Sequence, residues 1–398
     1  MIMKKNKNVH VIVSTGKWGQ DHLRYRRHRL AEFLKMHNET EEVVWLCPSS
    51  NKSEKPYEKL ENGIIQFPIS DILPPRIFRF SRFFDVFYKE KLQPFIEYLS
   101  KLKTENNLKF ILWYTYPGFP AIPQMFIWDK VIYDCSDLWV APVGGDSNLL
   151  TKLREESIRR SENRIITSAS NIICTSDFLG EKIKNNPRSS GKKIDVIENG
   201  VEYDLFQSSQ VKEDKRMDKL SNPILGYIGG IKPKLDFASI KALAKEHDNG
   251  TILFIGPDGT NGDTEFKDLL TLPNVVWLGK VDPLDVPSYM NKIDIGILPY
   301  KKSIYNQAVF PLKLFEFIAS GKLVVGMNLP STSKYNQEDV YYHTNSERDF
   351  LKVINEIILK NTYKENCDYR KQIAKRMSWE DIFTKMYALT KDDDSLFL

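Results

Sequence analysis

The feature that most constrains this chain is the alternation of short, continuous apolar runs with longer amphipathic segments. The runs have the length of β-strands and lack the polar alternation of a strand with one solvated face. Because they must be covered on both sides, they predict parallel sheets with helices on both faces. The runs are 9–13, 43–47, 110–114, 131–133, 172–175 and 194–197, and then 224–228, 251–255, 275–278, 293–298 and 323–326.

A polar stretch separates the two groups of runs and predicts where one domain ends. Residues 207–222 are rich in Lys, Asp and Ser, and a new apolar run starts at Ile224. A chain of 398 residues is also too long for one ordinary core. We therefore expect two doubly wound α/β domains, with the polar stretch as the linker between them.

The composition narrows the class of protein. The net charge of +5 permits an anionic ligand or membrane face without implying nucleic acid. No signal peptide precedes the first strand, and no apolar run approaches the roughly 18 residues of a membrane span. Four cysteines, without a CxxC pair or metal-ligand spacing, indicate buried thiols in a reducing compartment. The sequence thus predicts a cytoplasmic protein.

The segment 308–322 has the features of an anion-binding helix. Pro311 suits the first turn of a helix, and Gly321 suits the residue just past its end. Free N–H groups at the helix N-terminus attract a phosphate, and Lys313 adds a charge where the helix dipole disfavours a cation. Glu316 lies three residues later on the same side, where a carboxylate can accept both hydroxyls of a ribose. The alternative is a surface ion pair between Lys313 and Glu316 on an ordinary helix.

The same segment carries a family resemblance. PLKLFEFIASGK, residues 311–322, resembles the block PLKxFEYxAxGKPVV of GT-B glycosyltransferases related to family 4. Other blocks follow in the family's order, and the similarity spans nearly the whole chain. They are 133–139, 197–202, 225–230, 274–279 and 377–379. The opening 9–34 and the length also resemble glycosyltransferases of teichuronic acid biosynthesis in Gram-positive bacteria.

The resemblance implies a fold, a domain plan and an activity. The expected class is α/β of GT-B type, with two doubly wound Rossmann-like domains facing across a cleft. Residues 1–205 would bind the acceptor and 206–377 the nucleotide sugar, with a C-terminal helix, 378–392, crossing back. The expected activity is metal-independent hexosyl transfer, without a cofactor, from a nucleoside diphosphate sugar, UDP-linked, to a lipid-linked or polysaccharide acceptor in cell-wall synthesis.

The donor site is expected in the C-terminal half. Glu316 would hold the ribose, while Lys313, Lys232 and the helix N-terminus beside Leu312 would hold the diphosphate. Gly229 and Gly230 would let the backbone approach the diphosphate closely, and the alternative is a plain strand-to-helix turn.

One departure from the family concerns the donor sugar. Family 4 members commonly carry another glutamate, which contacts the donor sugar, at the place of Ala308. A glucuronosyl donor would suit a site without this carboxylate.

The N-terminal half offers candidates for catalysis. Asp137 follows the run 131–133 and could take the proton of an acceptor hydroxyl, with Asp134 as the second candidate. Both could instead cap the loop that follows. Trp18 and Gly19 follow the first strand, where the indole could stack on a sugar or simply pack in the core.

Two basic segments, 24–29 and 76–84, interleave cations with aromatic residues. Such a composition suits the anionic inner face of the cell membrane, on which the protein would be peripheral. The alternative is a solvated helix face whose phenylalanines fill the core, and no motif supports RNA binding. The rival functions are a non-catalytic membrane-associated subunit of a polysaccharide synthase and a sugar-nucleotide epimerase of GT-B fold.

Overall fold

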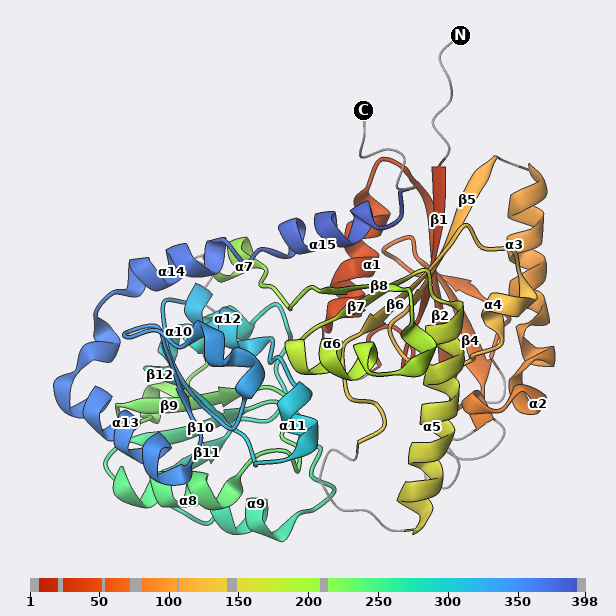
Figure 1. Ribbon diagram of the computed structural model, residues 1–398. Coiled ribbons are helices and arrows are strands. Elements are labelled where there is room, and N and C mark those ends of the chain that lie inside the picture. The colour runs from red at the N-terminus through yellow and green to blue at the C-terminus, as the bar shows by residue number, and fades with distance from the viewer. Residues whose placement is uncertain are drawn as a thin grey trace. The chain divides into compact units, whose positions relative to one another are not determined.

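The computed structural model describes residues 7–20, 24–51, 54–71, 81–105, 107–141, 149–207 and 214–391 (Figure 1). The chain divides into two compact units. Unit 1 comprises Met1–Val140, Ser147–Glu198 and Phe383–Leu398, and unit 2 comprises Ala141–Asp146 and Asn199–Ile382. The predicted boundary after residue 205 lies seven residues beyond the end of the second segment of unit 1.

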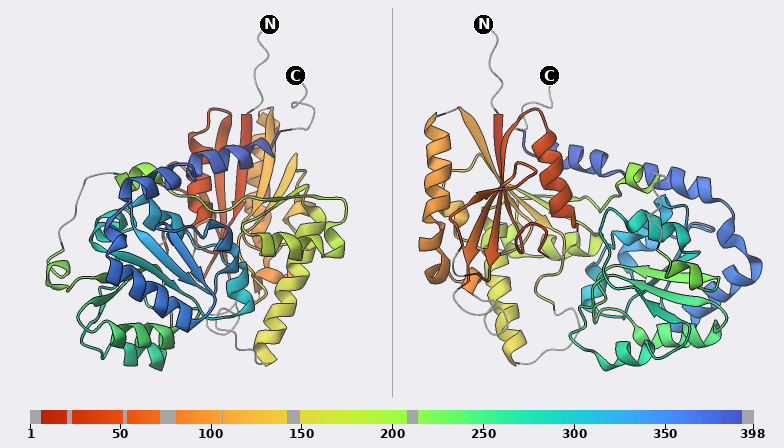
Figure 2. Two further views of the ribbon diagram at one scale, coloured as in Figure 1. Left: turned by 60° about the vertical axis from the view of Figure 1, so that its left-hand side comes forward. Right: turned by 180° about the vertical axis from the view of Figure 1, so that it is seen from behind.

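Unit 1 is built on an eight-stranded sheet with the order β3-β4-β2-β1-β5-β6-β7-β8, parallel except for the pairing of β3 with β4. The strand order reverses between β1 and β5, which pair in parallel. Helices α1 and α3 lie on opposite faces of this sheet (Figure 2). The strands are Lys7–Val13, Thr40–Ser49, Glu58–Lys59, Ile65–Ser70, Leu108–Tyr114, Lys130–Cys135, Asn171–Cys174 and Lys193–Val196 for β1 to β8.

The helices of unit 1 connect the strands of its sheet. The α-helices are α1 (Arg26–Met36), α2 (Asp85–Tyr88), α3 (Gln93–Glu105), α4 (Ile122–Met125), α5 (Leu149–Ser168) and α6 (Asp177–Lys184). Short 3-10 helices cover Ser81–Phe83, Glu90–Leu92 and Pro187–Ser189.

Unit 2 is built on a six-stranded parallel sheet with the order β11-β10-β9-β12-β13-β14, the strand order of Rossmann dinucleotide-binding domains. The order reverses between β9 and β12. Helices α8 and α9 cover one face of the sheet and α12 the other (Figure 1). The strands are Ile224–Ile228, Thr251–Ile255, Val275–Trp277, Ile295–Pro299, Leu323–Met327 and Tyr341–Thr344 for β9 to β14.

The last helix, α15 (Trp379–Ala388), begins in unit 2 and ends in unit 1, since the division falls between Ile382 and Phe383. The other helices of unit 2 are α7 (Tyr203–Gln207), α8 (Phe237–Glu246), α9 (Thr264–Leu269), α10 (Val286–Lys292), α11 (Ile304–Ala308), α12 (Lys313–Ala319), α13 (Glu347–Lys360) and α14 (Cys367–Lys375). Its 3-10 helices are Met217–Lys219, Pro330–Tyr335 and Thr362–Lys364.

The apolar runs predicted the strands well. Each of them coincides with a strand, and the strands that they missed are β3, β4 and β14. Strand β4 (IQFPIS) contains a glutamine and a proline, and β14 (YYHT) is short and polar, so neither has a continuous apolar run.

The prediction that the polar stretch 207–222 is a linker between domains is wrong for its described part. Met217 is buried in the core of unit 2, and Arg216 donates a hydrogen bond of 3.0 Å to the carbonyl of Leu278. Residues 208–213 lie outside the described residues. The described part of the stretch, 214–222, belongs to unit 2, and a polar segment at the surface of one unit cannot be distinguished from a linker by composition alone.

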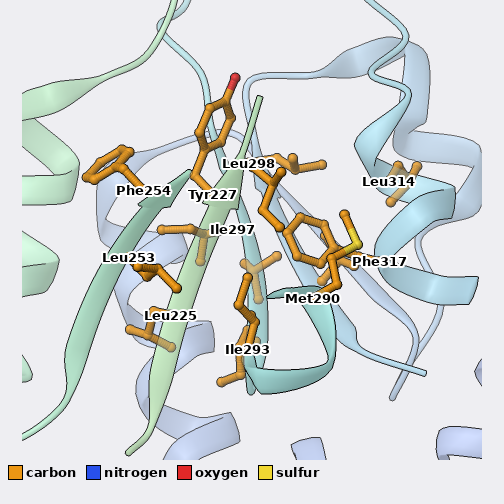
Figure 3. Close-up of a cluster of buried hydrophobic side chains, with 14 of the residues drawn as sticks. Leu225, Tyr227, Leu253, Phe254, Met290, Ile293, Ile297, Leu298, Leu314 and Phe317 are labelled. Atoms are coloured by element: carbon orange, nitrogen blue, oxygen red, sulfur yellow. The ribbon is translucent and has the colours of Figure 1, made fainter. Parts of the chain in front are cut away.

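A close approach between helix and sheet positions α12 in unit 2. Phe317 on α12 packs over β12 among the buried side chains shown in Figure 3. Gly296 of β12 makes room for it, because a Cβ atom there would lie 2.7 Å from Cγ of Phe317. The absence of a side chain at residue 296 therefore sets how closely α12 lies on the sheet.

We expect Gly296→Ala to lower the free energy of unfolding by about 1–3 kcal/mol, because the added methyl overlaps the Phe317 ring. Urea denaturation would measure this loss. Combining the substitution with Phe317→Leu should cost less than the sum of the two single changes, since the smaller side chain relieves the overlap. A Gly296→Ala variant as stable as the parent would contradict this account.

A buried histidine lies in the core of unit 1. His10 on β1 is fully buried, and its Nδ1 accepts a hydrogen bond of 3.2 Å from the Trp113 indole. Burial, with a smaller contribution from the charge of His37, lowers the pKa of His10 to about 3. The folded protein therefore keeps this imidazole neutral at pH values where the unfolded chain protonates it.

The stability of unit 1 should consequently fall in mild acid. As the pH drops from 7.5 to 5.5, the unfolded His10 gains a proton that the folded one does not, which costs about 1.4 kcal/mol. In His10→Asn, whose side-chain oxygen can still accept from Trp113, this part of the pH dependence should disappear. Urea midpoints at the two pH values test it. His247→Asn is the comparison: burial also lowers the pKa of His247, but His247 is only half-buried, so its replacement should remove a smaller part of the pH dependence. An unchanged pH dependence in His10→Asn would exclude this histidine as the cause.

Candidate active site

The loops after β9 and β12 lie where the strand order of unit 2 reverses. In open α/β sheets, ligands bind beyond the carboxyl ends of the strands at such a point. The two loops are joined by their backbones, with the amide of Lys301 donating to the carbonyl of Lys234 at 2.9 Å. Asn306 on α11 adds hydrogen bonds from its Nδ2 to the carbonyls of Lys234 and Lys301, at 3.1 and 2.7 Å.

Sequence reasoning missed Asn306, which joins these two loops. It is fully buried, and its Nδ2 is already used by the two carbonyls. In the sequence, Asn306 is only a polar residue between β12 and α12. The sequence does not indicate which carbonyl groups its side chain meets.

The glycines after β9 serve first to bring two loops together. Gly229 has a φ of +146°, and its amide donates to the carbonyl of Ile255 at 2.8 Å. A Cβ atom on Gly256 would lie 2.0 Å from the Gly229 carbonyl oxygen. Gly230 accepts a hydrogen bond from the Tyr227 hydroxyl at 3.2 Å. That this backbone also approaches a diphosphate stays a prediction.

Lys232 and Lys234 lie in the same loop and are both half-buried. The ammonium of Lys234 lies 4.9 Å from the centroid of the Tyr300 ring, a cation–π contact. Lys234 therefore helps to hold the loop after β12. That Lys232 meets a diphosphate stays a prediction.

Helix α12 ends as the sequence predicts. Gly321 has a φ of +74°, its amide donates to Ile318, and the amide of Lys322 donates to Phe317, each at 2.9 Å. These bonds form a Schellman motif, for which a glycine is the favoured residue. At the other end, the half-buried Leu312 is the N-cap residue, so Pro311 precedes the helix instead of lying in its first turn.

Lys313 and Glu316 form an ion pair on this helix, and the Lys313 ammonium donates to Oε2 of Glu316. The pair is not an ordinary surface pair, since the side chain of Glu316 is only 3% exposed and that of Lys313 is 24% exposed. Burying a carboxylate is costly, and the lysine offsets part of that cost. Ala308, at the place of the other glutamate of the family, is buried at the end of α11.

In unit 1, the loop after β1 places Trp18 in an aromatic cluster. Its ring lies edge-to-face with His28 and Trp45, each with centroids 4.9 Å apart, and its amide donates to Gln66 at 2.7 Å. These contacts support the packing alternative for Trp18. Gly19 is exposed with a φ of +71°, a conformation that favours glycine in this turn.

The two aspartates near β6 differ in environment. Asp134 lies within the strand, buried, and accepts from the Arg26 guanidinium at 3.0 Å. Burial raises the pKa of Asp134, and the charge of Arg26 opposes this shift. Asp137 lies in the loop beyond the strand and is half-buried. Because a general base must reach the acceptor, Asp137 is the better candidate of the two.

Comparisons with known proteins now identify the family. A family model described as glycosyl transferases group 1 matches residues 222–359. The chain is 47% identical to TuaH of Bacillus subtilis (strain 168), a protein that its name assigns to teichuronic acid biosynthesis as a glycosyltransferase, over 96% of this chain and 97% of TuaH. The chain belongs to the group 1 glycosyltransferases.

Solved structures agree with this glycosyltransferase in fold. Sucrose-phosphate synthase from Thermosynechococcus elongatus has a TM-score of 0.72 at 15% identity, over 96% of this chain and 98% of the synthase. HepE of Anabaena, in complex with UDP and glucose, has a TM-score of 0.67 at 13% identity, over 96% of this chain and 99% of HepE. The predicted α/β class of GT-B type is confirmed.

The remaining predictions concern cysteines, metals and membranes. Cys47, Cys135 and Cys174 of the glycosyltransferase are buried free thiols, as predicted, whereas Cys367 is exposed. Over the described ranges, no cluster of His, Cys, Asp and Glu could hold a metal ion. Over the same ranges, none of the helices has both the length and the apolar character to cross a membrane.

The two basic segments are less exposed than a membrane-binding face requires. In the first, Arg26 and Arg29 are buried. In the second, residues 76–80 lie outside the described residues, Arg82 is buried, and Phe83 fills the core of unit 1 as the alternative predicted. Phe84, at the end of that segment, is exposed.

Proposed function

We propose that this glycosyltransferase moves a sugar from a UDP-linked donor to a lipid-linked acceptor during synthesis of a cell-surface polysaccharide of the teichuronic acid type. The observation that carries the proposal is the Lys313–Glu316 pair on α12, the second helix after β12, the strand at which the strand order reverses. The name of TuaH supports the polymer, and the UDP complex of HepE supports the nucleotide.

The residues have distinct roles in the proposed reaction. Glu316 accepts from the ribose hydroxyls, while Lys313, Lys232 and the backbone at Gly229 and Gly230 compensate the charge of the diphosphate. The acceptor oxygen forms a bond to the anomeric carbon as the bond from that carbon to the diphosphate oxygen breaks. UDP leaves with the electron pair of that bond, and the carboxylate of Asp137 takes the proton of the acceptor hydroxyl.

The choice of donor sugar is based on the absence of a glutamate at residue 308. Ala308 stands where a second glutamate would face the donor sugar in related enzymes. A carboxylate on the sugar would be repelled by that glutamate and is tolerated without it, which favours a glucuronosyl donor. Strong preference for uncharged UDP-hexoses over UDP-glucuronate would exclude this choice.

Binding of the nucleotide can be tested by thermal shift. UDP and UDP-glucuronate should raise the melting temperature more than GDP or ADP, because only a ligand of the native state stabilises it. Glu316→Gln should weaken UDP binding by about 10- to 100-fold through loss of charge-assisted hydrogen bonds.

The matched control for Glu316→Gln is Glu356→Gln, which changes another helical Lys–Glu pair of unit 2. That pair, Lys352 with Glu356, is solvent-exposed with 3.9 Å between nitrogen and oxygen. Its loss should leave UDP binding unchanged. If Glu316→Gln bound UDP as tightly as this control, the assignment of the ribose site would fail.

An exposed apolar surface on unit 1 supports action at the inner face of the cell membrane. Phe84, Val86 and Phe87, at the start of α2, are 41%, 82% and 39% exposed. Adjacent exposed apolar side chains mark surfaces that bind other molecules or lipid. The lipid-linked acceptor of the proposal would be met at such a surface.

We expect the protein to float with phosphatidylcholine–phosphatidylglycerol vesicles, because the exposed apolar side chains can insert at the lipid surface. The double change Val86→Ser with Phe87→Ser should reduce the bound fraction by about tenfold or more, since both side chains lose burial in lipid. Ile127→Ser, which removes an isolated exposed side chain, is the control. Equal flotation of all three proteins would rule this surface out.

A further inference from the structure

Two buried N–H groups in unit 1 have no hydrogen-bond acceptor. They are Nε of Arg82 and Nε1 of Trp139, and neither has a partner among the residues that the structure describes. Leaving a buried donor unpaired costs about 1–3 kcal/mol, so such a group calls for an explanation. One explanation is that a bound ligand supplies the acceptor.

The side chains that carry these donors both lie beside one aromatic ring. Tyr116 lies edge-to-face with Trp139, with ring centroids 5.2 Å apart, and the central carbon of the Arg82 guanidinium lies 6.0 Å from its centroid. Tyr116 follows β5, which pairs with β1 where the strand order of unit 1 reverses. Ligands bind at such reversals in open α/β sheets.

Arg82 is held in a fixed orientation. Its side chain is 10% exposed, and Nη2 donates to Oδ2 of Asp71 at 2.5 Å. Its carbonyl accepts from the amide of Phe119 at 2.8 Å, which connects it to the loop that carries Tyr116. The guanidinium therefore presents Nε from a position set by both the carboxylate and the backbone.

The charge of this cluster is balanced. Asp71 neutralises Arg82. Burial raises the pKa of Tyr116, while the charge of Arg82 and its hydrogen bond to the phenol oppose this shift, so the phenol stays neutral. A balanced site that offers two N–H donors beside aromatic rings suits a ligand with uncharged oxygens and an apolar face.

We propose that Arg82, Tyr116 and Trp139 form a subsite for an uncharged pyranose ring of the acceptor. The C–H face of the sugar packs against the aromatic rings, while its hydroxyl or acetamido oxygens accept from the two N–H groups. Trp139 follows the candidate base Asp137 by two residues, so one loop would hold the sugar and take its proton. The proposal rests on the proposed function, which makes unit 1 the acceptor unit.

Saturation-transfer NMR with simple glycosides tests the subsite. The probes are methyl β-glucopyranoside, the methyl β-glycoside of N-acetylglucosamine and methyl β-glucuronide. Trp139→Phe keeps an aromatic ring but removes the indole N–H, and should weaken binding of the uncharged probes about three- to tenfold. Arg82→Lys keeps a cation for Asp71 but removes Nε, and should have a similar effect.

The control is Trp128→Phe. Trp128 lies before the amino end of β6, and its indole donates to the carbonyl of Ile122 at 3.2 Å. Its loss should leave glycoside binding as in the parent. Melting curves show whether each variant keeps its fold. Glycoside binding of each folded variant is then compared with that of Trp128→Phe.

The outcomes separate the two proposals. If UDP binds while Trp139→Phe and Trp128→Phe bind the glycosides equally, the subsite is wrong and the proposed function stands. Glycosides that fail to bind the parent protein would also overturn the subsite. Preference for the glucuronide would overturn its uncharged character. Failure of UDP to bind would count against the proposed function, whatever the glycosides do.

Discussion

The organisation of unit 1 depends on one buried guanidinium. Arg26 on α1 donates to Asp134 of β6 at 3.0 Å and to the carbonyl of Glu198 at 2.7 Å, and it contacts the sulfur of Met386 at 3.1 Å. Its partners thus lie on the sheet, at the end of the unit's second segment and on α15. Removing one partner of a buried charge pair commonly costs 3–5 kcal/mol, because the remaining charge stays buried.

This interaction also assigns different roles to neighbouring carboxylates. Asp134 is buried against Arg26 and holds the architecture of the unit, while Asp137, beyond the end of the strand, is half-buried at the carboxyl edge of the sheet. Glu316 in unit 2 combines the two situations, since it is buried but paired with a lysine that reaches solvent. Burial and partners, more than residue type, separate structural carboxylates from candidates for chemistry.

In unit 2, close backbone approaches position the candidate site. Gly296 admits the Phe317 ring, and Gly256 admits the carbonyl of Gly229, so α12 and the loop after β9 are both placed by missing side chains. The sequence showed glycines after a strand and suggested contact with a diphosphate. The structure adds that the glycines let the loop after β9 meet the loop after β10. Their spacing along the chain does not show whether they serve this packing or a ligand.

Local features of the sequence determined most of the strands, the Schellman end of α12 at Gly321 and the Lys313–Glu316 pair, because each depends on neighbours within one or two turns or one strand. Only the tertiary structure decided that Asp134 meets Arg26, 108 residues away, that Trp18 packs with Trp45, and that Arg82 and Trp139 share Tyr116. The order of strands in a sheet chooses which loops become neighbours at its carboxyl edge, and that order is set by the packing of the whole unit rather than by any short segment.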